Sequence, residues 1–216
     1  MKTVIAIDGP AASGKSSVAR ELASRLHYGY VNSGAFYRAI TWWVLDQKVD
    51  PASTEGVSAL LQATTLESGF EQGEAFFCIN HIDATTHLRD ETVNRNVSPV
   101  SRVPLVRESV TNHLHVLANH WEVVMEGRDI GSVVFPDTPF KFYIDASPEV
   151  RKQRRSAQGQ DDEIAARDRA DSSRPNAPLI IAEDALVVDS THLTVDGVVG
   201  EIIGRLKLQG LQVPSR

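Results

Sequence analysis

A glycine-rich run near the N-terminus has the residue types and spacing of a phosphate-binding loop. The run consists of Gly9, Pro10, Ala11, Ala12, Ser13, Gly14, Lys15, Ser16 and Ser17. Residues 9–16 match the pattern G-x-x-x-x-G-K-[ST], in which glycines let successive backbone N–H groups point at phosphate oxygens. In this pattern the lysine binds the β- and γ-phosphates and the next hydroxyl binds Mg²⁺. The run therefore predicts a nucleoside triphosphate site, with Ser16 as a ligand of Mg²⁺.

The segments on either side of this loop favour that interpretation over an ordinary glycine-rich turn. Residues 4–7 form a short apolar run, typical of a strand that is buried on both faces in a parallel sheet. After the loop, Val18, Leu22 and Leu26 are spaced four apart, which predicts an amphipathic helix over about 15–26. The N-terminus of such a helix attracts an anion through its dipole.

Strands and helices alternate along most of the chain. Further strands are expected at about 28–31, 122–125, 140–144 and 185–188, and further helices at about 34–49, 55–63, 88–96, 104–119, from 147 and at 195–208. This alternation predicts an α/β fold, a three-layer sandwich with a parallel sheet. Residues 66–70 and 75–79 are rich in strand formers and flank Gln72-Gly73, which predicts a β-hairpin insert.

Composition excludes several classes of protein. Hydrophobic residues make up 42% of the chain, enough for a buried core. The net charge of −6 is a poor match for a nucleic-acid backbone, and no stretch approaches the about 20 apolar residues of a membrane span. The single cysteine, Cys78, fits a reducing compartment. We therefore expect a cytoplasmic protein that binds neither nucleic acid nor membrane, and the sequence leaves its protein partners unknown.

Arginines recur in segments that follow strands or join helices, namely Arg38, Arg107, Arg128, Arg167 and Arg174. The guanidinium group binds phosphate with two parallel hydrogen bonds, so a convergence of several would suit a phosphorylated second substrate. For most of these arginines, taken singly, a solvated surface position is the better interpretation. Arg128 is the exception, because it directly follows the predicted strand at 122–125 and is expected near the phosphate loop.

Several segments together resemble one family. They are the phosphate loop, residues 33–38 (Ser-Gly-Ala-Phe-Tyr-Arg), residues 127–137 (Gly-Arg-Asp-Ile-Gly-Ser-Val-Val-Phe-Pro-Asp), then Arg167-Asp168, Asp171, Arg174, residues 177–179 and residues 184–191. In this order, and over nearly the whole chain, they resemble the bacterial cytidylate kinases, a nucleoside monophosphate kinase branch of the P-loop kinases. The segment at 127–137 is the most specific.

The resemblance implies an activity and a role for each matching residue. The implied reaction moves the γ-phosphoryl group of ATP to CMP or dCMP, with Mg²⁺ as cofactor, and the phosphate loop as the ATP site. Lys15, Arg128 and Arg174 are the implied catalytic residues. The implied CMP ligands are Ser33, Arg107 and Asp129 for the base, Arg38, Arg128 and Arg174 for the phosphate, and Ser98, Arg167 and Asp171 for the sugar.

The implied organisation is one kinase domain over 1–216. Its core is expected at about 1–35, 103–150 and 176–208, a nucleoside-monophosphate-binding insert at about 36–102 and a short lid at about 151–175. Two features depart from the family: Asn32 replaces a usual aspartate, and the segment at 156–166 is shortened. Arg151, Arg154 and Arg155 share a helix face, where an ATP contact and a solvated basic face are equally consistent with their spacing, so they are left out of the catalytic set.

The chemistry of the base agrees with the resemblance. An ionised Asp129 would accept a hydrogen bond from the cytosine amino group and oppose the carbonyl oxygen of uracil. Three alternatives are a P-loop kinase with another acceptor, a nucleotide-switch GTPase and an RNA-binding protein that uses residues 151–155. The segment at 127–137 argues against the first, the lack of an N-K-x-D segment against the second, and the acidic net charge of −6 against the third.

Overall fold

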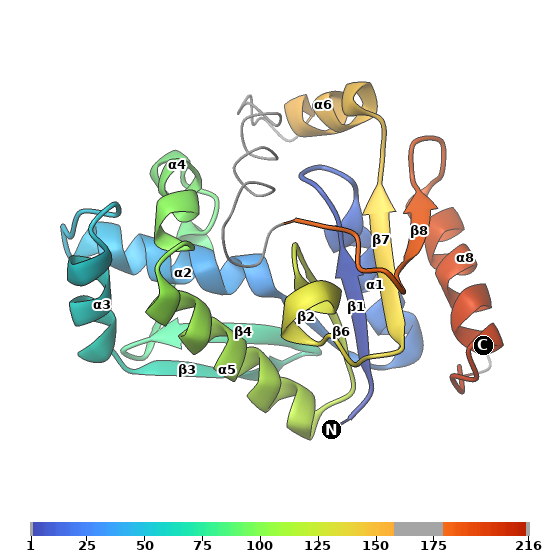
Figure 1. Cartoon of the computed structure of the whole chain (residues 1–216), viewed down its shortest axis with the longest axis horizontal. Helices are drawn as coiled ribbons and strands as arrows, with labels where there is room; N and C mark the ends of the chain where they lie inside the picture. The colour runs from blue at the N-terminus through green and yellow to red at the C-terminus, as the bar shows by residue number, and fades with distance from the viewer. Residues whose placement is uncertain (1, 158–178, 215–216) are drawn as a thin grey trace. The chain divides into compact units, whose positions relative to one another are not determined.

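The computed structural model describes residues 2–157 and 179–214 (Figure 1). Its strands are β1 (Val4–Asp8), β2 (Gly29–Asn32), β3 (Leu66–Glu71), β4 (Glu74–Ile79), β5 (Ile82–Asp83), β6 (Val123–Gly127), β7 (Phe140–Asp145) and β8 (Leu186–Asp189). Its α-helices are α1 (Lys15–Leu26), α2 (Ser33–Asp46), α3 (Thr54–Gln62), α4 (Glu91–Val100), α5 (Pro104–His120), α6 (Pro148–Ser156) and α8 (Val195–Leu208). Two short helical turns are η1 (Thr85–His87) and the π-helical η2 (Ile130–Val134). Within the described ranges no helix is long and apolar enough to cross a membrane.

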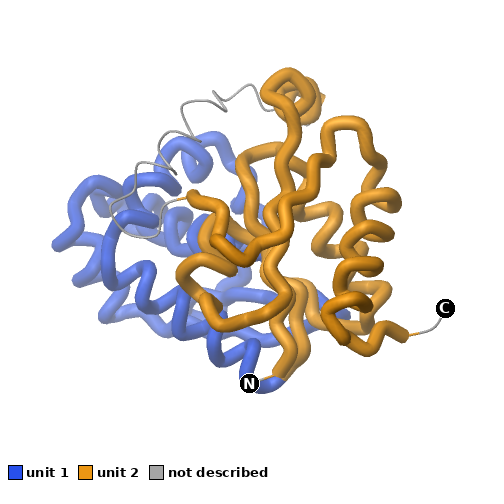
Figure 2. Tube along the Cα trace, turned by 45° about the vertical axis from the view of Figure 1, so that its right-hand side comes forward, with its two compact units in different colours: residues 1, 32–120 blue, residues 2–31, 121–216 orange. Residues whose placement is uncertain are grey.

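The chain divides into two compact units (Figure 2). Unit 1 comprises residues 32–120, and unit 2 comprises residues 2–31 and 121–216. Unit 1 includes α5, which packs against α2, α3 and β3. The predicted core at 103–150 would place α5 with the phosphate loop instead, so the two divisions differ there.

Unit 2 is built on a parallel sheet with strand order β2-β6-β1-β7-β8. β1 pairs in parallel with β6 and with β7, and β7 pairs in parallel with β8. One face of the sheet, which carries Ile5, Ile7 and Phe142, forms a continuous core with α1 and α8 (Figure 1). Every residue of β1 is buried, as the apolar run predicted. The predicted α/β class with a mostly parallel sheet is therefore confirmed.

The opposite face of this sheet carries Ala6 and Lys141, and the turn η2 contacts β1 there. Gly131 makes that contact possible, because a β-carbon at this position would lie 3.1 Å from the side chain of Lys141 and 3.4 Å from Ala6. The Lys141 ammonium is buried and donates to the Asp184 carboxylate at 2.7 Å and to the Pro136 carbonyl. Lys141 thus fixes the chain just beyond η2.

Unit 1 combines helices with an antiparallel hairpin. β3 pairs with β4 from Leu66↔Ile79 to Glu71↔Glu74, and Gln72 and Gly73 turn the chain with positive φ values of 50° and 83°. Positive φ at both central residues matches the right-handed twist of a two-residue hairpin, so the predicted hairpin is confirmed. α2 packs on this sheet through Phe36, whose ring stacks on Phe77 with centroids 4.5 Å apart.

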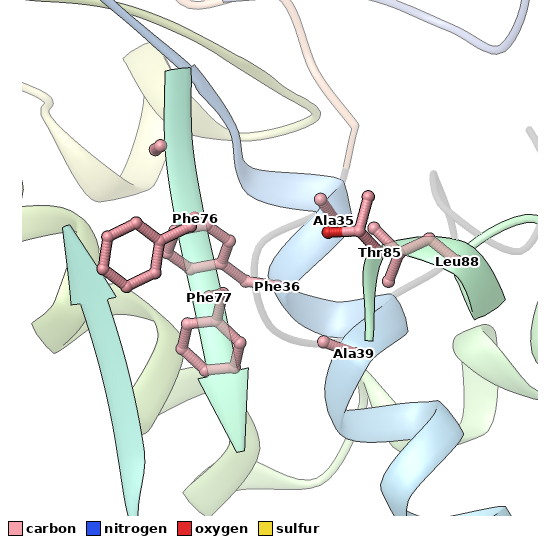
Figure 3. Close-up of a pocket in the computed structure, with 8 residues that line it drawn as sticks. Ala35, Phe36, Ala39, Phe76, Phe77, Thr85 and Leu88 are labelled. Atoms are coloured by element: carbon pink, nitrogen blue, oxygen red, sulfur yellow. The ribbon is translucent and has the colours of Figure 1, made fainter. Parts of the chain in front are cut away.

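A small apolar pocket lies within unit 1 (Figure 3). It is lined by Ala35, Phe36, Ala39, Ala75, Phe76, Phe77, Thr85 and Leu88. Its volume of about 40 Å³ is far below the about 300 Å³ at which ligand pockets begin. This pocket is a gap between α2 and the hairpin and has no room for a nucleotide.

Some elements differ from the sequence prediction. α4 begins at Glu91 and runs to Val100, whereas the prediction placed a helix at 88–96. The predicted start at residue 88 was wrong, because the chain first forms the separate turn η1 and the helix begins only after Asp90. The turn η2 was not predicted, since its first N–H groups are bound by a side chain more than 120 residues away in sequence. Most of the predicted lid at about 151–175, with nearly all of the shortened segment at 156–166, lies outside the described residues.

Candidate functional site

The phosphate loop follows β1 directly and depends on glycine at its first position. Gly9 has φ 155°, and a β-carbon there would lie 2.1 Å from the carbonyl oxygen of Ile144 on β7. Gly14 has φ 92°, and Ala12 adopts the left-handed conformation at φ 58°. The loop therefore has a fixed path that a larger residue at Gly9 would disrupt.

The loop ends at the N-terminus of α1, where no side chain caps the helix. The first N–H groups of such a helix, together with its dipole, favour an anion. Lys15, in the first turn, is 8% exposed, and its ammonium donates to the Pro10 carbonyl at 3.0 Å. An ammonium has three N–H donors, so this bond is compatible with a second bond to phosphate.

Ser16 lies beside a buried carboxylate. Its hydroxyl donates to Oε1 of Glu126 at 2.7 Å, and Glu126 lies at the end of β6. A hydroxyl and a carboxylate are hard oxygen donors of the kind that Mg²⁺ prefers. The described residues contain no group of three or more potential metal-ligating side chains, but Mg²⁺ bound with a nucleotide takes most of its ligands from phosphate and water. The two side chains therefore fit a magnesium ion that arrives with ATP.

Arg128 reaches the phosphate loop, as the sequence predicted. Its guanidinium NH1 donates to the Gly9 carbonyl at 2.7 Å. Asp129, the next residue, is 4% exposed and leads into η2. The segment of the chain with the most specific resemblance thus meets the phosphate loop within one unit.

Asp8, the last residue of β1, is a functional candidate that the sequence analysis missed. Its two carboxylate oxygens accept hydrogen bonds from the backbone N–H groups of Ile130 and Gly131, at 2.8 and 2.7 Å. Burial raises the pKa of Asp8 from 3.8 to about 7, and the nearby Asp129 also raises it, while the two N–H groups and Lys15 lower it. The sequence did carry a signal for Asp8: it is a charged residue at the end of an apolar run, immediately before the phosphate loop.

Two arginines of α6 also contact the loop, although they were left out of the predicted catalytic set. Arg151 donates to the Ala146 carbonyl at 3.1 Å and to the Ala11 carbonyl at 3.4 Å. Arg154 donates to the Ser13 carbonyl at 3.2 Å and to the backbone and side-chain oxygens of Ser190 at 2.7 and 3.0 Å. These contacts place both side chains against the loop, and whether they also contact ATP stays a prediction.

The predicted acceptor ligands of unit 1 lie on three helices. Ser33 begins α2 and is buried, and Arg38 lies farther along the same helix. Arg107 of α5 lies over the ring of Tyr37, 5.6 Å from its centroid. Ser98 of α4 has a buried hydroxyl without a hydrogen-bond partner among the described residues. Because α2 packs against both α4 and α5, unit 1 gathers these positions around one helix.

Asn32, which departs from the family pattern, caps α2. Its side-chain oxygen accepts a hydrogen bond from the Ala35 N–H at 3.1 Å. Asparagine and aspartate are comparable at this position of a helix, so the substitution preserves the start of the helix that carries Ser33 and Arg38. The remaining predicted ligands, Arg167, Asp171 and Arg174, lie outside the described residues.

Comparison with known proteins identifies the family. The family model described as cytidylate kinase matches residues 5–208. The chain belongs to the cytidylate kinase family. A cytidylate kinase from Geobacillus sp. (strain WCH70) is 43% identical over 92% of this chain and 94% of its own length. One from Corynebacterium efficiens is 41% identical over 93% of this chain and 92% of its own, and one from Streptomyces griseus is 38% identical over 91% and 89%.

Membership of the cytidylate kinase family decides between the alternatives drawn from the sequence. The match extends through the phosphate loop, unit 1 and the segment at 127–137, and it also spans residues 158–178, which the structure does not describe. A nucleotide-switch GTPase or an RNA-binding protein is not favoured by a match of this extent. The resemblance seen in the sequence motifs is confirmed.

Proposed function

We propose that this enzyme transfers the γ-phosphoryl group of ATP to CMP or dCMP and releases ADP with CDP or dCDP. The observation that carries the proposal is the cytidylate kinase match over residues 5–208. It is joined by the phosphate loop, where the carbonyl of Gly9 accepts a hydrogen bond from the Arg128 guanidinium. A kinase with a different phosphorylated acceptor has no comparable support.

On the donor side, the loop from Gly9 to Ser17 is proposed to bind the phosphates of ATP. Its support is the uncapped N-terminus of α1 and the position of Lys15 against the loop. Ser16 and Glu126 would hold Mg²⁺, which neutralises phosphate charge when bound. The contacts of Arg151 and Arg154 with loop carbonyls would keep the loop in the shape that phosphate requires.

On the acceptor side, the proposed ligands are those that the family resemblance implies. Ser33, Arg107 and Asp129 would bind the base, Arg38, Arg128 and Arg174 the phosphate, and Ser98, Arg167 and Asp171 the sugar. The support available from the structure is the burial of Ser33 and Asp129 and the buried hydroxyl of Ser98, which has no hydrogen-bond partner within residues 2–157 and 179–214. Buried polar groups of this kind reject a ligand that leaves them unpaired.

The chemical step needs no general base. The attacking oxygen of the acceptor phosphate is already anionic, so it forms the new P–O bond while the bond to the β-phosphate oxygen breaks and its electron pair leaves with ADP. The protein contributes positioning and positive charge, from Lys15 and Arg128 and from the proposed Arg174. Each of these groups would act on charge that is spread over the transferred phosphoryl group.

An ADP-release assay across CMP, dCMP, UMP, AMP and GMP tests the proposal. We expect kcat/KM to be highest for CMP and dCMP at neutral pH, with UMP lower by roughly 10-fold or more if a charged hydrogen bond reads the base. A higher kcat/KM for AMP, GMP or UMP would contradict the proposed acceptor. Omission of Mg²⁺ from the same assay should remove activity.

The proposed location is the cytosol, where both substrates occur and where a chain with one cysteine needs no disulfide. The proposed partners are the small-molecule substrates, ATP and CMP or dCMP. The acidic net charge of −6 supports a protein that binds its anionic ligands through local groups rather than through a basic surface.

A further inference from the structure

The carboxylate of Asp8 joins the strand that leads into the phosphate loop to the turn that follows Arg128 and Asp129. Asp8 is 5% exposed and is the last residue of β1, immediately before Gly9. Each of its two oxygens accepts one backbone N–H, from Ile130 at 2.8 Å and from Gly131 at 2.7 Å. Both oxygens of one side chain are thus committed to the first two residues of η2.

The turn that Asp8 holds is closed by its own backbone bonds. The Asp129 carbonyl accepts from the N–H groups of Val133 and Val134, at 2.9 and 3.0 Å, so the residues after Asp129 form one stiff unit. A shift of that unit would move the backbone of Asp129 with it. The far end is fixed separately by Lys141, which donates to the Pro136 carbonyl and to Asp184.

The same strand end also holds Arg128. The residue after Asp8 is Gly9, and its carbonyl accepts from the Arg128 guanidinium at 2.7 Å. The end of β1 therefore holds the Arg128-Asp129 pair at two points: the Gly9 carbonyl binds the side chain of Arg128, and the Asp8 carboxylate binds the backbone that follows Asp129.

We propose that Asp8 is a positioning residue that couples the phosphate loop to the acceptor-reading pair Arg128 and Asp129. This inference rests on the proposed function, because it assigns that pair to the acceptor. Burying a carboxylate costs free energy, as its raised pKa reflects, and a perturbed carboxylate next to a candidate site is typical of functional positions. The charged groups that face it are Asp129 and Lys15.

The test compares Asp8→Asn with the parent at pH 8, where Asp8 is ionised. An amide side chain keeps one acceptor oxygen and places an N–H₂ group against the second N–H, so the turn should loosen with little change in volume. The matched control is Ile202→Val, a core change on α8 that lowers stability away from the turn. Three quantities are measured: KM for CMP, Kd for ATP, and hydrogen exchange of the Ile130 and Gly131 amides.

Asp8→Asn should raise KM for CMP by about 10-fold or more, leave Kd for ATP within about twofold, and speed exchange of the two amides. Ile202→Val should lower Tm but leave KM for CMP, Kd for ATP and exchange of the two amides at their parental values. An equal loss of ATP and CMP affinity would overturn the inference in favour of a role in shaping the loop alone. Unchanged constants for both ligands would overturn it in favour of a purely structural role.

Two further measurements keep the outcome decisive. If Asp8→Asn fails to fold, hydrogen exchange of the Ile130 and Gly131 amides is measured in the parent. Fast exchange there would contradict stable hydrogen bonds from these amides to the Asp8 carboxylate, and with them the inference. Lys141→Met, which releases the far end of the segment, should raise KM for CMP in the same direction. If the parent prefers another monophosphate, the proposed function fails, and the same comparison is made with that acceptor.

Discussion

At the scale of single residues, the loop is held by side chains that bind main-chain oxygens. Lys15 donates to the Pro10 carbonyl, Arg128 to the Gly9 carbonyl and Arg154 to the Ser13 carbonyl. Three cations thus surround one short loop in a chain whose net charge is −6. Local charge of this kind attracts phosphate regardless of the net charge of the protein.

Lys15→Ala should leave the fold intact and lower kcat by about 100-fold or more, because the variant lacks the ammonium proposed to neutralise the negative charge of the transferred phosphoryl group in the transition state. Steady-state kinetics and a circular dichroism spectrum check both parts. Lys207→Ala, at the exposed end of α8, is the control and should keep parental activity. A folded Lys15→Ala enzyme with near-parental turnover would refute the catalytic role of Lys15.

Asp129→Ala should lower kcat/KM for CMP much more than for UMP. In the proposed role, the parent carboxylate would accept from the cytosine amino group and oppose the uracil carbonyl, and a charged hydrogen bond corresponds to roughly 10- to 150-fold. The measured quantity is the ratio of the two kcat/KM values, with the exposed Asp137→Ala as a control from the same segment. Equal losses with both substrates would mean that Asp129 does not read the base.

At the scale of elements, the candidate site is assembled from the carboxyl ends of neighbouring parallel strands. β1 ends in Asp8 and the loop, β6 ends in Glu126 and Gly127 before Arg128, and β7 leads into α6 with Arg151 and Arg154. In such sheets the strand ends meet at one edge, which is where ligands bind. Ser190, just after β8, joins the same edge by donating to the Ser13 carbonyl at 2.8 Å.

Arg154→Ala should weaken ATP binding more than CMP binding. Arg154 links α6 to the loop at Ser13 and to Ser190, and its loss removes this link between the loop and α6. We expect KM for ATP to rise by about 10-fold, as for lost charged hydrogen bonds, and Arg154→Lys to recover little, since one ammonium cannot reproduce the fork. Lys152→Ala, an exposed change on α6, should have no effect, and a parental KM in Arg154→Ala would contradict the link.

At the scale of the whole molecule, Asp8 makes stability depend on pH. Its pKa is about 7 in the folded protein and 3.8 ordinarily, so between these values the unfolded chain has released the proton that the folded chain retains. Stability from this group is therefore complete below about pH 4 and is lost as pH rises through 7. Asp184 and Asp189 have lowered pKa values and act in the opposite direction at lower pH.

The prediction is a change in the stability difference between the parent and Asp8→Asn. From pH 5 to pH 8 the free energy of unfolding of the parent, relative to the variant, should fall by about 2–3 kcal/mol. Urea denaturation at several pH values measures this difference, and other titrating groups cancel because both proteins carry them. A difference that stays constant from pH 5 to pH 8 would show that the pKa of Asp8 is not raised.

Much of this protein follows from local sequence. The helices at 15–26 and 195–208 begin and end as their apolar spacing predicted, and the hairpin forms where Gln72-Gly73 predicted it. The phosphate loop and its flanking elements were also predictable, because hydrophobic period and glycine position act over a few residues. These features depend only on neighbours in the chain.

The sequence by itself thus determined the fold class, the phosphate loop and the family motifs. The tertiary structure alone decided how the loop is held: Asp8 binds Ile130 and Gly131, Ser16 binds Glu126, and Arg154 binds Ser13. Each of these contacts joins residues more than 100 positions apart, and which strand ends become neighbours depends on the order of strands in the sheet. No local period records that order, so it emerges only when the sheet has formed.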